Sequence, residues 1–82
     1  MFNYEAIDKT PTVYQIRAII DYMAKDSYNG YNFSNMMSMS RPKKNVVMVD
    51  LNNAHTGKDY EVIFEDDLIT IKSLKQVGSW IS

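Results

Sequence analysis

The chain contains no cysteine, only two prolines and three glycines, and no long apolar run. Without cysteine it has no disulfide, no thiol nucleophile, no iron–sulfur ligands and no cysteine zinc site. Small secreted domains usually depend on disulfides, so this absence favours a reducing compartment, and we expect a cytoplasmic protein. No stretch approaches the ~18 apolar residues that cross a bilayer, so no membrane partner is expected.

An excess of one sign of charge is also missing, because nine basic and ten acidic residues leave a net charge of −1. General nucleic-acid binders are strongly basic and acidic mimics of nucleic acid are strongly negative, so the balance argues against both classes. Apolar residues make up 45% of the 82 residues, which is enough for one packed core. The whole chain, 1–82, is therefore expected to form a single domain.

The clearest predicted element is a helix over about residues 11–26. Thr10 is the expected N-cap and Pro11 the first helical residue, where its missing N–H costs nothing. Apolar residues recur along it at spacings of three and four and form one stripe, which predicts packing on a sheet. Gln15 falls on another face of the helix. The stripe consists of Val13, Ile16, Ile19, Ile20 and Met23.

Three strands are predicted after the helix, from alternating or β-branched apolar residues: about 45–52, 59–65 and 68–73. Asn52–Lys58 is the expected hairpin loop, with Gly57 supplying a positive φ. Residues 2–7 also alternate and would add a fourth strand at an edge. The expected fold is α+β, with one main helix packed on a small antiparallel sheet of three to four strands.

The tail, Ser73–Ser82, is expected to form a helical turn interrupted at Gly78, because Leu74, Val77 and Trp80 are spaced by three. Trp80 has two interpretations. The favoured one is that it closes one end of the core, because a domain this small needs its large side chains. The other is that it is an exposed anchor for a partner, since tryptophan is enriched among binding hot spots.

Residues suited to catalysis or metal binding are scarce. His55 is the only histidine, and no nucleophile elbow or glycine-rich oxyanion loop accompanies it. Glu65, Asp66 and Asp67 form an acidic run without the ligand spacing of an EF-hand. We therefore expect no enzyme, no catalytic residue, no cofactor and no metal ion. A small hydrolase or metal-dependent enzyme is the last alternative.

Charge is segregated along the chain. Residues 41–58 contain four basic side chains and one acidic one, whereas residues 59–67 contain five acidic side chains and no basic one. A hairpin would set the two segments side by side. The charges then either pair across the strands or give the surface a positive and a negative pole that steers a partner.

The stretch Asn29–Lys44, NGYNFSNMMSMSRPKK, has three interpretations. In the first, Ser34 caps a short helix that ends before Pro42, and its methionines fill gaps in the core. In the second, aromatic and methionine side chains form an adaptable protein-binding face: Tyr28, Tyr31, Phe33, Met36, Met37 and Met39. In the third, Tyr31 and Phe33 stack on bases while a basic patch holds phosphates: Arg41, Lys43 and Lys44.

The expected function is that of a small, non-catalytic intracellular protein that binds another protein and modulates or inhibits it. No site chemistry is visible, whereas a chain of this length can present an interface of roughly 800 Å². Its Asn-, Tyr- and Met-rich composition is also typical of accessory proteins of bacteriophages and mobile elements. Binding of nucleic acid by the basic patch is the first alternative, and assembly into a twofold homodimer is a further one.

Overall fold

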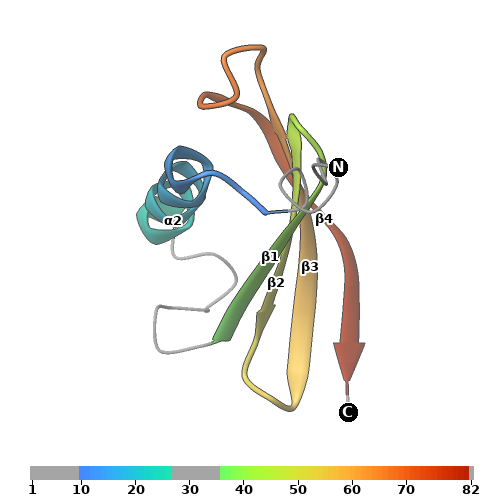
Figure 1. Cartoon of the computed structure of the whole chain (residues 1–82). Helices are drawn as coiled ribbons and strands as arrows, with labels where there is room; N and C mark the ends of the chain where they lie inside the picture. Colours follow the sequence, from blue (N-terminus) through green and yellow to red (C-terminus); the bar gives the residue numbers. More distant parts are fainter. Residues whose placement is uncertain (1–9, 27–35, 82) are drawn as a thin grey trace.

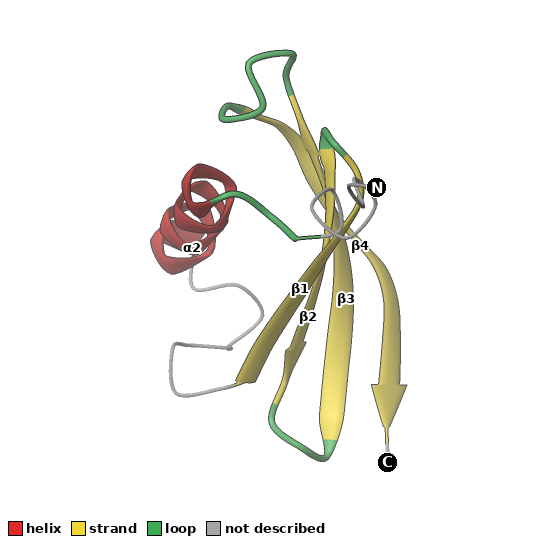
Figure 2. Ribbon diagram, viewed as in Figure 1, coloured by secondary structure: helices red, strands yellow, loops and turns green. Residues whose placement is uncertain are grey.

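The computed structural model describes residues 10–26 and 36–81. In this part of the chain there is one α-helix, α2 (Val13–Asp26), and four strands: β1 (Met36–Lys43), β2 (Val46–Asn52), β3 (Thr56–Phe64) and β4 (Ile71–Ile81). The strands form an antiparallel sheet in the order β1-β2-β3-β4, and α2 lies against one of its faces (Figures 1 and 2). The predicted α+β class is confirmed. No helix within the described ranges is long and apolar enough to span a membrane.

Strand β1 corrects the first interpretation of the stretch 29–44, which predicted a short helix where the chain is extended. Met37 and Met39 alternate with two serines, and this period of two suits a strand whose faces have different surroundings. Pro42 lacks an N–H, but β1 is at the end of the strand order, where a missing ladder donor is tolerated. The register with β2 shifts next to it.

Strand β4 replaces both the third predicted strand, 68–73, and the helical turn predicted for 73–82. The neighbours Asp59 and Tyr60 pair with two residues of β4 that are not neighbours, so Val77 between these partners is an extra residue, a β-bulge. The bulge breaks the alternation along β4, so Leu74 packs against the core while Val77 and Trp80 lie on the outer face, and their spacing of three does not mark one helical face. The further strand expected at 2–7 lies outside the described residues.

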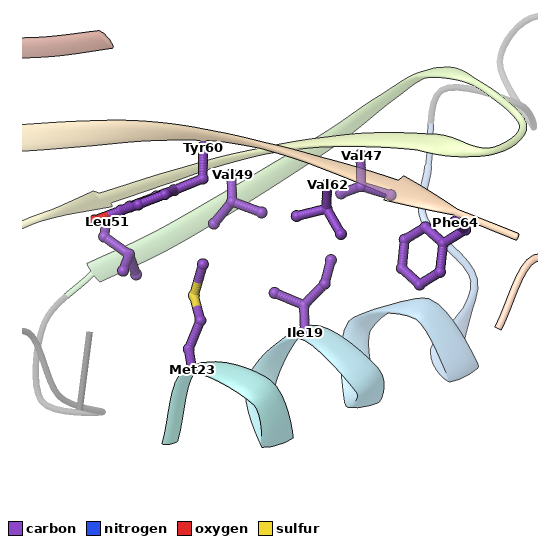
Figure 3. Packing of buried hydrophobic residues seen from close by; sticks show 8 residues of the cluster. All are labelled: Ile19, Met23, Val47, Val49, Leu51, Tyr60, Val62 and Phe64. Atoms are coloured by element: carbon purple, nitrogen blue, oxygen red, sulfur yellow. The ribbon is translucent and has the colours of Figure 1, made fainter. Parts of the chain in front are cut away.

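The core lies between α2 and the sheet (Figure 3). Alternate residues of β2 and β3 point toward α2, so the residues between them point to the opposite side, which we call the outer face. Eight buried apolar side chains form the core: Ile19, Met23, Val47, Val49, Leu51, Tyr60, Val62 and Phe64.

Helix α2 begins at a capping box rather than at the predicted Thr10. The Thr12 hydroxyl oxygen accepts the N–H of Gln15 at 3.1 Å, and the Gln15 Oε1 accepts the N–H of Thr12 at 3.1 Å. These reciprocal bonds satisfy two of the backbone donors that a helix leaves unpaired at its start. Pro11 precedes the cap and is buried instead of occupying the first helical position.

The buried line of α2 is rotated relative to the predicted apolar stripe. Gln15, Ile19 and Met23, four residues apart, are buried, whereas Val13 is 74% exposed. A polar residue therefore occupies a position that periodicity alone would assign to an apolar one.

The Gln15 side chain also ties the start of α2 to the hairpin of β1 and β2. Its Nε2 donates to the carbonyl of Lys44 at 3.0 Å, and its Oε1 accepts from the Nη1 of Arg41 at 3.2 Å. Arg41 is only 6% exposed. A buried amide is stable here because each of its two polar ends has a partner.

The connection between β2 and β3 is shorter than the predicted loop, because β3 already begins at Thr56. Asn53 Oδ1 accepts the N–H groups of His55 at 3.0 Å and Thr56 at 2.8 Å, which closes the turn. Ala54 has the positive φ, 77°, that had been predicted for Gly57. Gly57 lies in β3, where its missing side chain leaves room for the ring of Trp80.

Candidate protein-binding surface

In the part of the chain that the structure describes, no element covers the outer face of the sheet, since α2 lies on the other side (Figure 2). Exposed faces of antiparallel sheets are usually polar. Here two apolar side chains are about half exposed, Met36 at 56% and Val77 at 48%. Met36 lies on β1 and Val77 on β4, the two edge strands, so apolar surface is exposed at both sides of this face.

The middle of the outer face is hollowed by an open depression of about 370 Å³. All four strands contribute to it, so its shape depends on the whole sheet. The side chains around it are small polar, acidic and apolar ones: Ser38, Ser40, Met48, Asp50, Asp59 and Val77.

Asp50 and Asp59 lie directly opposite each other on β2 and β3 and are hydrogen-bonded. Partial burial opposes ionisation of Asp50, but hydrogen bonds from Asp59, Trp80 and Asn52 outweigh it and lower the pKa of Asp50. The bond to Asp50, together with burial and the charge of Asp50, raises the pKa of Asp59. The pair therefore keeps one proton to a higher pH than an isolated aspartate does.

Trp80 fixes one side of this pair. Its Nε1 donates to the Asp50 Oδ2 at 2.8 Å, while Asn52 Nδ2 donates to the other oxygen of Asp50 at 2.7 Å. The indole lies directly against Gly57, where an added Cβ would be 2.3 Å from the ring. Trp80 is thus not part of the core cluster, and the ring is half-buried on the outer face.

The predicted protein-binding residues are divided between the two faces of the sheet. Met36 is exposed, whereas Met37 and Met39 are half-buried and pack against the core. Three further members of the group lie outside the described residues: Tyr28, Tyr31 and Phe33. Among the described members, only Met36 has substantial exposure.

The predicted basic patch is divided as well. Arg41 is buried and donates to Gln15, so its guanidinium is not at the surface. Lys43 and Lys44 are exposed at the connection between β1 and β2.

The remaining candidates for catalysis or metal binding, His55 and the acidic run, are not brought together into one site. His55 is exposed in the turn between β2 and β3. The Asp67 carboxylate accepts the N–H groups of Ile69 and Thr70 and the Thr70 hydroxyl, and these bonds lower its pKa. Among the residues that the structure describes, no three His, Asp or Glu side chains are grouped so that they could hold a metal ion. The expectation of a non-catalytic protein stays a prediction.

The group formed by Asp50, Asp59 and Trp80 was not predicted as a site. A turn limited to residues 53–55 sets the two aspartates opposite each other, but the longer predicted loop left that register open. The contact of Trp80 depends on the bulge in β4, which has no clear signal in a single sequence.

No protein-family model, no curated protein and no solved structure matches this chain.

Proposed function

We propose that this chain is a non-catalytic domain that binds another protein through the outer face of its sheet and modulates or inhibits that protein. The supporting observation is that this face presents the exposed Val77 and the half-buried Met48 around a carboxylate pair, with no described element over them. Methionine and tryptophan are enriched in the buried centres of protein interfaces, and both occur here.

The charge of the face specifies the partner. Asp50 and Asp59 bring negative charge into a surface of Met48, Val77 and Trp80. A complementary partner presents a basic side chain among apolar ones. Arginine fits best, because its planar guanidinium donates to two carboxylates at once and also stacks on an indole.

The test is affinity capture from a lysate of the natural host, with nuclease added, using three forms of the chain. Val77→Glu places a charge on the outer face at an exposed position, and Tyr14→Glu places the same charge on α2, where Tyr14 is 68% exposed. The wild type and Tyr14→Glu should retain the same protein, and Val77→Glu should lose it. Equal capture by both variants, or recovery that depends on nucleic acid, contradicts the proposal.

The regulatory half of the proposal needs a second measurement. The activity of the captured protein is assayed with increasing amounts of the wild type and of Val77→Glu. A change that saturates at a stoichiometric ratio with the wild type, and is absent with Val77→Glu, supports modulation. Binding with no change in the partner's activity contradicts it.

A further inference from the structure

Two exposed clusters of opposite charge lie at the same end of the sheet. In an antiparallel sheet of order β1-β2-β3-β4, the β1–β2 and β3–β4 connections emerge at one end, as Figure 1 shows. The first connection carries Lys43 and Lys44, and the second carries Glu65 and Asp66. All four side chains are exposed, and no ion pair joins any of them to another described residue.

The two clusters are about two strand spacings apart, roughly 10 Å. A twofold axis normal to the sheet would set the basic connection of one molecule against the acidic connection of another, twice over. We infer that this end of the sheet is a self-complementary surface that binds the same end of a second copy of the chain. This end of the sheet is a different surface from the outer face, so self-association there is independent of the proposed function.

The acidic connection, residues 65–70, is suited to a contact because it holds one shape. The Asp67 carboxylate binds two backbone N–H groups and the Thr70 hydroxyl, so it is occupied within the connection. Leu68 has a positive φ of 63°, which turns the chain sharply. Ile69 is 49% exposed beside the carboxylates and supplies apolar area to the contact.

An interface of this kind is weak and sensitive to salt. Exposed ion pairs contribute little each, and at an ionic strength of 0.1 M charges are screened over about 10 Å. We expect the wild type to form a dimer at about 25 mM salt and high protein concentration, with dimer affinity at least roughly tenfold lower at about 500 mM.

The test is sedimentation equilibrium on two charge-reversed variants, alone and mixed. Lys43→Glu/Lys44→Glu makes both clusters acidic, and Glu65→Lys/Asp66→Lys makes both basic. Each variant alone should be monomeric at low salt. An equimolar mixture should form heterodimers, because every contact then joins opposite charges.

The matched control is Lys25→Glu/Lys75→Glu, which changes net charge as much as the first variant but alters exposed lysines elsewhere. It should dimerise like the wild type. Circular dichroism confirms that each variant is folded. A wild type that is monomeric at low salt, a dimer that persists in high salt, or a mixture that stays monomeric overturns the inference.

Discussion

Replacing Gln15 with methionine is expected to cost about 3 kcal/mol of folding free energy. The change keeps the side chain's length and its helix propensity but removes its three hydrogen bonds. The bonds to the Thr12 N–H and the Lys44 carbonyl are each worth about 1 kcal/mol, and a bond to a charged group such as Arg41 about 1.5–3 kcal/mol. Better burial of the apolar methionine offsets part of this sum.

The loss is large relative to the total. A domain of this length has a free energy of unfolding of about 4–12 kcal/mol, and a urea dependence of roughly 1 kcal/mol per molar for so small a chain. The midpoint of urea unfolding should therefore fall by roughly 2–3 M. Fluorescence of Trp80, the single tryptophan, reports the transition.

Two further variants separate the contributions. Gln76→Met makes the same chemical change at an exposed position on β4 and should shift stability by less than about 0.5 kcal/mol. Thr12→Ala removes the cap but leaves the links to Arg41 and Lys44, so it should cost about 1 kcal/mol. If Gln15→Met is no more destabilising than Gln76→Met, the reasoning that Gln15 joins helix and hairpin is wrong.

Two other predictions concern the outer face. Gly57→Ala should displace Trp80 from Asp50, destabilise the fold by about 1–3 kcal/mol and shift tryptophan emission to the red, because the new Cβ would meet the ring at 2.3 Å. Gly78→Ala is the control: its Cβ would approach an Asp59 oxygen at 3.3 Å, and it should have a smaller effect; equal effects would contradict the account. Asp59→Asn should stabilise the free protein at pH 7 by a few tenths to about 1 kcal/mol, because the amide supplies a donor to Asp50 and removes a like charge opposite it. The pKa of Asp59 is raised above 3.8, so wild-type Asp59 becomes protonated and loses its charge as the pH falls through that pKa. The stability advantage of asparagine, measured by urea titration, should therefore shrink in that pH range. A difference in stability that does not depend on pH would refute this account.

The sequence predicts those parts of the fold in which the spacing of apolar residues matches the spacing of buried side chains. Along β2, Val47, Val49 and Leu51 alternate with more exposed residues, and on β3 Tyr60 and Phe64 do the same. In these strands one face meets the core and the other meets solvent, so the side-chain period is the period of the strand.

The wrong predictions arise where one local feature changes the period. In β4 the extra residue Val77 breaks the alternation, so that Leu74 and Trp80 point to opposite faces although their spacing to Val77 is that of a helix. Gln15 is buried because its amide is fully bonded, and a hydropathy pattern contains no information on its partners Arg41 and Lys44. Glycine is common in turns, but position 57 needs a glycine because the ring of Trp80, which is distant in sequence, packs directly against it.

Two polar clusters in this small domain differ in whether all of their contacts are favourable. Around Gln15 every bond joins a donor to an acceptor, and no described buried side-chain polar atom lacks a partner. On the outer face, two carboxylates are paired across adjacent strands, an arrangement that destabilises the free protein. Because folded proteins keep such conflicts mainly where function requires them, and because a partner's cation would relieve this one, the outer face is where binding should be sought first.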